Sequence, residues 1–429
     1  MSYYADDVRF RGGGYSGGSD AVFSVPDTGP TVDVRKKPST PWYKRWKCLS
    51  IFLAPPLLLL LIFIMPSRMD VRILTLFAPP DFVQANGLKP NELLAAGQKI
   101  LQNELIGPES LMEVDGAIYA TTYEGELVKI VQDQIVQRLQ IGPACKPNCK
   151  RSTEEKTGRP LGLRRAQDGW FIIADAYHGL MAADMETNSS FTILSSDTEI
   201  KGHKIRFMND LVINEDGKIY FTDSSIKWQR KDFPYILLEA KGDGRVLSFD
   251  PKTGDVDEVA RNLFFPNGIE LTDNGTALLV AETGKARILK IALPERPNIN
   301  QKGTYRFWVR SLPGFPDNIR KGKHGNYWVC FAATRAPRQS NFIDSTALRP
   351  WIRKLIAKLV PTDLLFGAFG RFKPNYGIIL ELNNEGRVVS SWHDPTGKVV
   401  RDCSEVLDTE EGLYLGSYHT PYLVKVPYS

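Results

Sequence analysis

Short runs in which apolar and polar residues alternate recur six times along the chain, each beginning at a turn that contains glycine. Such runs, rich in Ile, Tyr, Phe, Val and Trp, are typical of strands, and Asp-Gly or Asn-Gly pairs are typical of hairpin turns. Most of these turns are about 50 residues apart, the length of a four-stranded propeller blade. The sequence therefore predicts an all-β fold, a six-bladed β-propeller, because a β-sandwich would have turns at shorter intervals. The turn glycines are Gly116, Gly169, Gly217, Gly275, Gly325 and Gly412.

An uncharged apolar run from Cys48 to Met65 interrupts this pattern near the N-terminus. Its length is close to the lower limit for a helix that crosses about 30 Å of hydrocarbon. A cleaved signal peptide is the alternative, but it would begin with a short basic leader, whereas here a long segment precedes the run. We therefore expect a transmembrane signal anchor over 48–66, a disordered cytoplasmic tail over 1–47 and the propeller over 67–429.

Charges beside this run predict its orientation. Basic residues without any acidic one fill the stretch 35–47, whereas only Arg68 and Arg72, beside Asp70, follow the run closely. Because positive flanks stay in the cytosol, we expect a single-pass type II protein of the plasma membrane or endoplasmic reticulum, with the propeller outside the cytosol. Two sequons for N-glycosylation lie on that outer side and predict a glycoprotein. Their asparagines are Asn188 and Asn274.

Composition narrows the possible functions further. A net charge of +5, with 24% of residues charged, leaves no dense basic face of the kind that binds nucleic acid. The last interval between turn glycines is longer and contains an insertion over 337–372, in which Trp351, Leu355 and Leu359 recur at helical spacing beside basic residues such as Lys358. Two interpretations stay open: a helix lying on the propeller face, or a basic amphipathic lid that covers a central pocket or touches the membrane surface.

Four oxygen-bearing side chains occupy one position relative to the turn in four different repeats. Glu109 lies seven residues before its turn glycine, and Asn209, Asn267 and Asp317 each lie eight before theirs. In a radial repeat, equal position along the blade means equal depth beside the central axis, so we expect these side chains to converge. Two carboxylates and two amide oxygens are hard ligands that suit Ca²⁺, so the set predicts a calcium site.

Longer motifs resemble known families. GPES, FMNDL, FPNGI and PGFPDNI resemble the calcium-ligand segments of propellers such as gluconolactonases and paraoxonases. GRPLG, ADAYHGL, YFTDSSIKWQR, LVAETGKARI, RPWIRKLIAKL and LYLGSYHTPYL are similar to the adipocyte plasma membrane-associated protein and strictosidine synthase-like family. The resemblance implies a type II glycoprotein with a calcium-containing propeller and arylesterase activity. It also implies that the metal ligands are Glu109, Asn209, Asn267 and Asp317.

Three further residues are candidates for proton transfer. His178 and His419 follow the turn glycines of the second and sixth repeats, and an imidazole near a metal-bound ester activates water at neutral pH. A histidine that is hydrogen-bonded at the tunnel rim is the alternative for each. By the resemblance, Asp408 matches the position at which strictosidine synthase has a proton-transferring glutamate. Its side chain is one methylene shorter, which argues against the amine–aldehyde condensation of that enzyme.

Five cysteines are too few for a disulfide scaffold. Cys145 and Cys149 flank a short loop, and in an oxidising compartment we expect them to form a small disulfide. Cys330 lies in an apolar strand, where we expect a buried thiol.

These features together predict a calcium-dependent hydrolase whose partner is a small aryl ester or lactone. Bound Ca²⁺ would stabilise the developing oxyanion while a histidine or carboxylate activates water. A cell-surface adhesion or receptor propeller with structural calcium requires the same ligands and stays open as a different class of function. Amine–aldehyde condensation is a third hypothesis. The sequence predicts no particular protein partner.

Overall fold

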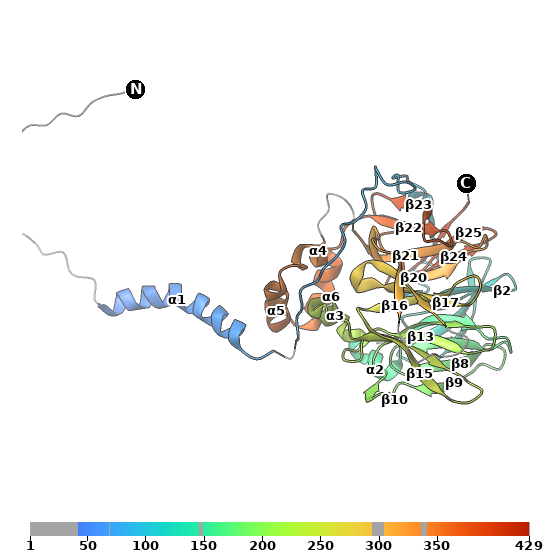
Figure 1. Ribbon diagram of the computed structural model, residues 1–429, viewed down its shortest axis with the longest axis horizontal. Coiled ribbons are helices and arrows are strands. Elements are labelled where there is room, and N and C mark those ends of the chain that lie inside the picture. The colour runs from blue at the N-terminus through green and yellow to red at the C-terminus, as the bar shows by residue number, and fades with distance from the viewer. Residues whose placement is uncertain (1–41, 68, 146–148, 294–303, 336–340, 429) are drawn as a thin grey trace, which may run out of the picture. The chain divides into compact units, whose positions relative to one another are not determined.

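The computed structural model describes residues 42–67, 69–145, 149–293, 304–335 and 341–428 (Figure 1). The chain divides after Leu59 into two compact units, and the second contains all of the strands. Helix α1 (Trp42–Ile64) coincides with most of the predicted anchor and begins inside the predicted disordered tail. Within the described part of the chain, no helix is long and apolar enough to cross a membrane. The remainder of the predicted tail, residues 1–41, lies outside the described residues.

Six antiparallel sheets of four strands form the second unit, which confirms the predicted six-bladed β-propeller. Blade 1 comprises β2 (Leu111–Val114), β3 (Ala117–Thr121), β4 (Glu126–Val131) and β5 (Gln134–Gln140). Blade 2 comprises β6 (Pro160–Arg165), β7 (Phe171–Asp175), β8 (Gly179–Asp184) and β9 (Ser189–Ser195). Blade 3 comprises β12 (Met208–Ile213), β13 (Ile219–Asp223), β14 (Gly244–Phe249) and β15 (Val256–Leu263). Blade 4 comprises β16 (Pro266–Leu271), β17 (Ala277–Glu282), β18 (Arg287–Ala292) and β19 (Tyr305–Val309). Blade 5 comprises β20 (Gly314–Lys321), β21 (Tyr327–Thr334), β22 (Gly377–Leu382) and β23 (Val388–Asp394).

The sixth blade joins the two ends of the propeller. It contains β24 (Val406–Thr409), β25 (Gly412–Leu415) and β26 (Leu423–Val426) from the end of the chain, and its outer strand is β1 (Gln98–Ile100) from the beginning. Lys99 of β1 pairs with Val424 of β26. The inner strands β2, β6, β12, β16, β20 and β24 contact their neighbours around the ring, so the sheets close and leave no long exposed edge near the axis.

Each predicted turn glycine lies in the hairpin between the first and second strands of a blade. Their φ angles are positive, for example 75° at Gly116 and 86° at Gly217, a conformation that glycine adopts without a Cβ clash. Both predicted glycosylation sites are exposed at hairpin turns. Asn188 lies between β8 and β9, and Asn274 lies between β16 and β17.

The hydrophobic core is divided into clusters between adjacent blades. Ala174 and Leu180 of blade 2 pack with Leu211 and Phe221 of blade 3, and each other pair of neighbouring blades buries a similar cluster. The second strand of a blade is covered by a neighbour on both faces, and β17 is accordingly buried at all six positions. This burial explains why ALLVAE is apolar almost throughout instead of alternating.

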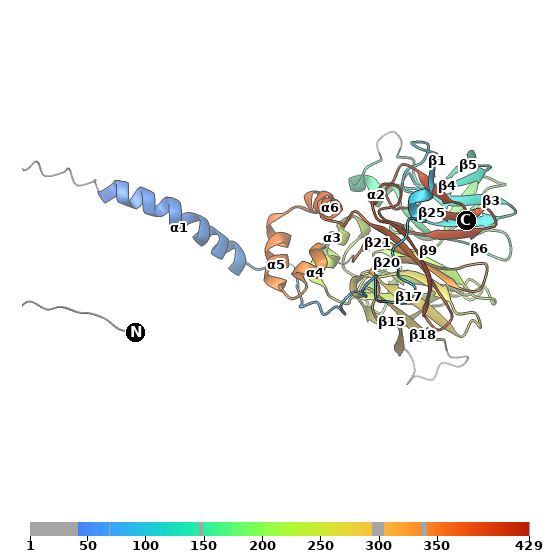
Figure 2. The same cartoon turned by 90° about the horizontal axis from the view of Figure 1, so that it is seen from above.

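Short helices gather at one end of the propeller (Figures 1 and 2). The insertion, which connects β21 to β22 in blade 5, contains three of them and contacts α3 between β13 and β14. The α-helices of this unit are α2 (Glu154–Thr157), α3 (Phe233–Glu239), α4 (Phe342–Thr346), α5 (Pro350–Leu359) and α6 (Thr362–Arg371). The remaining elements are η1 (Leu94–Ala96), η2 (Arg151–Thr153), η3 (Arg230–Asp232), η4 (Thr283–Lys285), β10 (Glu199–Ile200) and β11 (His203–Lys204).

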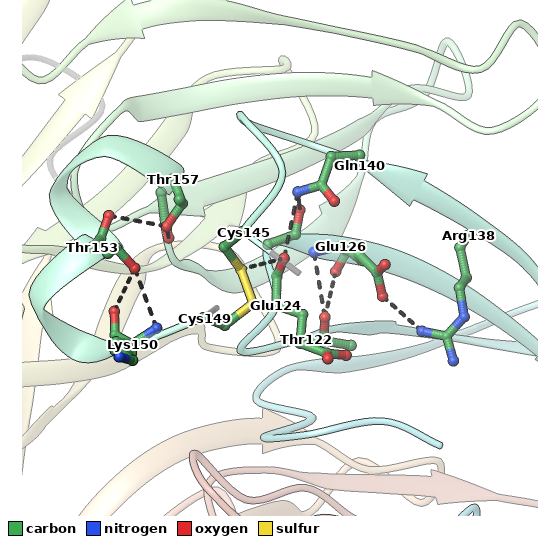
Figure 3. The surroundings of a disulfide bond; sticks show 12 residues. Thr122, Glu124, Glu126, Arg138, Gln140, Cys145, Cys149, Lys150, Thr153 and Thr157 are labelled. Carbon is green, nitrogen blue, oxygen red and sulfur yellow. Dashed lines mark hydrogen bonds and ion pairs between the residues drawn. A yellow bond between two sulfur atoms is a disulfide. The ribbon is translucent and has the colours of Figure 1, made fainter. Parts of the chain in front are cut away.

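Two disulfides are present. Cys145 and Cys149 pair as predicted, and Cys145 Sγ also lies 3.5 Å from the carbonyl oxygen of Glu124 (Figure 3). The prediction of a buried free thiol at Cys330 is wrong, because Cys330 pairs with Cys403. Both of these cysteines are buried, and the bond connects blade 5 to the segment that leads into blade 6. The partner was not predicted because nothing local to either cysteine indicates a contact between distant segments.

Candidate functional site

A cavity of about 500 Å³, here called the central cavity, lies between the propeller and the insertion. Its floor is formed by the inner strands and the loops before them, and its cover by α3, α4 and α6. Aromatic rings dominate the wall, so the cavity offers an apolar surface around a few polar groups, as small-molecule sites commonly do. The aromatic wall residues are Phe207, Phe233, Phe265, Phe315, Phe342, Phe366, Phe369, Phe372 and Tyr418.

All four predicted metal ligands lie on the wall of the central cavity. Glu109 lies two residues before β2, and the other three lie in the inner strands β12, β16 and β20. The register of those strands shifts at the ligand positions, for instance between Pro266 and Ile269 around Asn267. Such a bulge turns a side chain out of the regular alternation of the sheet. A bulge at the same place in successive blades is the physical reason for the common spacing from the turn glycines.

The ligand set is held by specific hydrogen bonds. Asn267 Nδ2 donates to Asp317 Oδ1 at 2.7 Å, and Asn209 Nδ2 donates to Ser224 Oγ at 3.0 Å. The guanidinium of Arg159 donates to Glu109 Oε2 at 2.9 Å. Asn267 Oδ1 is buried and has no hydrogen-bond partner among the described residues. A buried carbonyl oxygen without a partner is costly, so this atom is available to a ligand from the cavity.

The surroundings of the two carboxyl groups in this site disfavour their charged forms. Burial raises the pKa of Asp317 well above its ordinary value, and the nearby Glu109 carboxylate raises it further. Burial also raises the pKa of Glu109, although Arg159 opposes this shift. A cation placed between the two carboxylates would favour their charged forms. The charges of this site are therefore complementary to a metal ion.

The residues present fit Ca²⁺ in chemical type. They supply two carboxylates and two amide groups, one of which has an unpartnered oxygen, and hard oxygen atoms are the ligands that Ca²⁺ binds. Within the described ranges, no group of three or more His, Cys, Asp or Glu side chains has the arrangement of a metal site. The predicted ligand set is not such a group, because two of its four members are the amides Asn209 and Asn267.

One of the three predicted proton-transfer residues lies on the same wall. His419 Nε2 lies 3.1 Å and 3.2 Å from the two carboxylate oxygens of Asp402. Asp402 is also bound by Lys373 Nζ at 2.5 Å, and the same Nζ donates to the hydroxyl of Tyr418 at 3.1 Å. All four residues contact the central cavity. Lys373 directly follows the insertion, so this cluster connects the cover of the cavity to the segment before blade 6.

Asp402 stays ionised in this cluster. Burial favours its neutral form, but Lys373 and His419 outweigh burial and hold the pKa of Asp402 below its ordinary range. Burial lowers the pKa of Lys373, an effect that Asp402 opposes. An ionised carboxylate at Nε2 fixes the orientation of the imidazole and leaves Nδ1 as the ring nitrogen that can accept a proton.

The structure places the other two predicted residues away from the central cavity wall. His178 lies after β7, where its backbone N–H donates to Asp175 Oδ1 at 2.9 Å. Asp408 lies at the far end of β24, where its carboxylate accepts from the Trp328 indole and the Lys323 backbone N–H, both at 3.1 Å. Asp408 is therefore not positioned as the glutamate of a condensing enzyme would need to be.

Sequence reasoning missed Asp402, Lys373 and Tyr418. Asp402 precedes the last inner strand as Glu109 precedes the first, but it lies farther from its turn glycine and so escapes the common spacing. Lys373 follows the last helix of the insertion, and nothing in its neighbourhood indicates that it reaches the propeller axis.

Beneath the ligands lies a second group of charges, the axial ion cluster, formed by Asp210, Arg320 and Glu405. Arg320 donates to both carboxylate oxygens of Asp210 at 2.6 Å and 2.9 Å and lies 2.6 Å from Glu405 Oε2. Burial opposes the charge of Arg320, but the two carboxylates outweigh burial and raise its pKa. Asp210 directly follows Asn209 in the bulge of β12, so the cluster fixes the backbone that presents this predicted ligand.

Comparisons with known proteins agree with this architecture. Residues 209–295 match the strictosidine synthase family model, and residues 87–130 match the model of the N-terminal part of strictosidine synthase-like proteins. Adipocyte plasma membrane-associated protein from Danio rerio is 39% identical over 380 residues, 88% of each chain. The Homo sapiens protein of that name is 36% identical over 381 residues, again 88% of each chain.

Solved structures share the fold at low sequence identity. A gluconolactonase from Xanthomonas campestris superposes with a TM-score of 0.51 at 15% identity, covering 85% of this chain and 99% of its own. That likeness concerns the propeller architecture alone. The identity and coverage shared with the adipocyte proteins are much higher, and the chain belongs to the adipocyte plasma membrane-associated protein family, within the strictosidine synthase-like propellers.

Proposed function

We propose that this protein is a membrane-anchored, calcium-dependent hydrolase of carboxylic esters or lactones. The observation that supports the proposal is the convergence, on one aromatic-lined cavity, of a hard-oxygen ligand set with a histidine that is oriented by a carboxylate. A cation site beside a general base is the arrangement that metal-assisted hydrolysis requires. The fold neighbour named a gluconolactonase acts on a lactone, which is consistent with this reaction class.

The residues divide the work between binding and proton transfer. Glu109, Asn209, Asn267 and Asp317 would hold the Ca²⁺, which supplies positive charge for the carbonyl oxygen of the substrate. His419 Nδ1 takes a proton from a water molecule whose oxygen forms a bond to the carbonyl carbon. The bond from that carbon to the alkoxy or aryloxy oxygen then breaks, and the leaving oxygen receives the proton from His419. The products are a carboxylic acid and an alcohol, or a hydroxy acid from a lactone.

The wall of the central cavity favours an apolar substrate. Phenylalanine rings from the propeller, such as Phe207 and Phe315, face the same space as Phe342 and Phe369 from the insertion. Burying an aryl or alkyl group among them removes apolar area from water, at about 25 cal/mol for each Å². The polar groups gather at the floor, so they would bind the carbonyl end. We therefore propose aryl esters and apolar lactones as the substrate class.

We propose that the protein is anchored in a membrane through the apolar run 48–66, with type II topology. The relatives are named plasma membrane-associated, and the basic flank on the N-terminal side of the run supports a cytosolic location of that side. Extraction of the full chain with alkaline carbonate tests the anchor, because an integral protein stays in the pellet. Protection of the propeller from protease in sealed vesicles tests the orientation, and digestion in vesicles that keep the cytosolic face outside would contradict it.

The test of the proposed activity is turnover of an aryl ester by the full chain with and without a calcium chelator. We expect chelation to abolish turnover and restored Ca²⁺ to recover it. The double variant Asn267→Ala, Asp317→Ala should lose activity, whereas Asn384→Ala on a surface turn should keep it. Undiminished turnover after complete calcium removal would contradict the proposal. A fall in Tm on chelation, without turnover above background in any condition, would instead support a binding propeller with structural calcium.

A further inference from the structure

Helix α5 differs from an ordinary surface helix in burying a cation. Its one buried residue is Arg353, whereas its apolar residues are all half-buried or exposed. The guanidinium of Arg353 donates to the backbone carbonyl oxygens of Leu238 at 2.9 Å and Ala347 at 3.1 Å. Carbonyls at the ends of α3 and α4 thus satisfy the buried cation. A surface helix normally buries its apolar stripe and leaves its charges in water.

The side of α5 that faces away from Arg353 is largely apolar and partly exposed. At 100° per residue, Trp351 and Leu355 lie almost opposite Arg353, and Leu359 continues the stripe. Trp351 is 55% exposed and Leu359 is 47% exposed. Neighbouring parts of the insertion add Leu348 at 73% and Leu364 at 65%. We call this surface the insertion face: Leu348, Trp351, Leu355, Leu359 and Leu364.

Basic residues border the insertion face and connect it to the apolar run. Arg349, Lys354 and Lys358 flank the stripe on α5. Lys358 Nζ donates to the carbonyl oxygens of Ile62 at 2.7 Å and Phe63 at 3.0 Å. These two residues close the apolar run and belong to the same compact unit as the propeller. The side chain of one lysine therefore connects the border of the insertion face to the end of that run.

These features select a phospholipid bilayer as the occupant of the insertion face. An exposed tryptophan with leucines and bordering cations is the composition of a helix that lies in the membrane interface. The cations complement anionic headgroups. A membrane that reaches Ile62 and Phe63 would also lie beside α5.

The insertion face is continuous with the cover of the central cavity. Phe372, at the end of α6, is 64% exposed and also contributes to the cavity wall. Leu364 lies on the same helix as the cavity residues Phe366 and Phe369. Docking of the insertion face would therefore bring the mouth of the cavity to the acyl-chain boundary. An apolar substrate dissolved in the bilayer would then reach the cavity without crossing water.

We propose that the insertion face docks onto the bilayer and that the central cavity takes its substrate from the membrane. The docking rests on the proposed anchor, and the route of the substrate rests on the proposed hydrolase activity. Together they narrow the substrate class to esters or lactones that partition into lipid. Docking and turnover are measured separately, so a failure of one does not conceal the other.

The docking experiment uses the full chain reconstituted into phosphatidylcholine liposomes that contain some phosphatidylserine. Tryptophan fluorescence is measured with and without phosphatidylcholine brominated on its acyl chains, in the wild type and in Trp351→Phe. We expect bromolipid to quench a component of the emission that Trp351→Phe lacks. Trp170→Phe, a position in blade 2, serves as the control and should leave that quenched component in place. Equal quenching in the wild type and in Trp351→Phe would overturn the docking.

The route of the substrate is tested with two esters and one pair of variants. Leu348→Ser with Leu359→Ser alters the insertion face, and Val136→Ser with Phe191→Ser alters exposed apolar residues of the blades as a control. Removing two apolar contacts should lower turnover of a long-chain ester in the bilayer roughly tenfold or more. Turnover of a water-soluble aryl ester should stay unchanged. Equal loss on both esters, or no loss on the bilayer ester, would overturn the membrane route. Absence of turnover with both esters in the wild type would contradict the proposed hydrolase, and the quenching result would still decide the docking.

Discussion

Arg320 and Asp210 form a buried ion pair on the propeller axis in which the guanidinium donates to both carboxylate oxygens. The two residues come from blades 5 and 3, so the pair bridges the axis beneath the ligand set. Glu405 completes the cluster from the segment before blade 6. Buried ions of this kind are tolerated because each charge has a partner, and the loss of one partner leaves an uncompensated charge in a medium of low dielectric constant.

The axial ion cluster should make Arg320→Met strongly destabilising. Two buried carboxylates would lose their cation, and we expect the free energy of unfolding to fall by about 3–5 kcal/mol. Urea unfolding at neutral pH measures this change. Lys204→Met is the matched control, because its partner Asp197 is exposed and such surface pairs contribute about 0–1 kcal/mol. Equal effects of the two substitutions would show that the cluster contributes no more than a surface pair.

Substitution of Asp402 should affect turnover more than substrate binding. In Asp402→Asn the imidazole of His419 loses its ionised partner, and Lys373 loses its ion pair. Because a positioned general base contributes roughly 10²–10⁴-fold to a rate, we expect kcat to fall by about 100-fold or more with a small change in KM. His419→Ala should give a similar loss. The exposed His324→Ala is the control, and a loss of kcat there would indicate a nonspecific effect.

His393 should make stability depend on pH in the mildly acidic range. It is fully buried between the Tyr376 hydroxyl and Ser391, and burial lowers its pKa from 6.5 to about 4. Between these two pH values the unfolded chain binds a proton that the folded chain does not. Stability is therefore lost as the pH falls through this range, by about 3 kcal/mol in total.

The variant His393→Gln separates this effect from that of the carboxylates, which titrate over a similar pH range. The difference in the free energy of unfolding between wild type and variant should change steadily as the pH falls from 6.5 to about 4 and level off below. Urea titrations across that range supply the measurement. A constant difference at all pH values would mean that His393 titrates alike in the folded and unfolded chains.

The Cys330–Cys403 disulfide should contribute to both stability and turnover. It closes a long loop, with a sequence separation of 73, and bonds of this kind typically contribute about 2–4 kcal/mol. Cys403 is adjacent to Asp402, so Cys330→Ala with Cys403→Ala should also lower kcat. Cys145→Ala with Cys149→Ala is the control, since it opens a separation of only 4. Thermal melts and ester kinetics on both double variants test this prediction. An unchanged kcat in Cys330→Ala with Cys403→Ala would show that the disulfide does not influence the site.

Much of the fold was predictable because the blades repeat a local pattern. A glycine turn, an alternating strand and a bulge of fixed position are each determined by a few neighbouring residues. Four residues could be selected for this reason, since they stand seven or eight residues before their turn glycines and the structure brings them to one cavity: Glu109, Asn209, Asn267 and Asp317. The calcium itself stays a prediction.

The rest of the site depends on contacts between distant segments. Lys373 reaches Asp402 because three helices of the insertion return the chain over the axis, and no local pattern determines that path. Cys330 and Cys403 meet for a similar reason across two blades. The resemblance that selected Asp408 matched a position along the chain, whereas the structure places that side chain at the other end of β24.

The pairing of β1 with β26 determines when the protein can finish folding. The first strand of the propeller to leave the ribosome has its partner in β26, which follows every other strand of the propeller in the sequence. Blades 1 to 5 can each form from contiguous segments while translation continues, but blade 6 stays incomplete until β26 has been synthesised. Until then β1 presents an unpaired edge, and the inner strands of blades 1 and 5 lack a neighbour. Loss of β26 would therefore leave β1 and β25 with exposed edges, prone to aggregation.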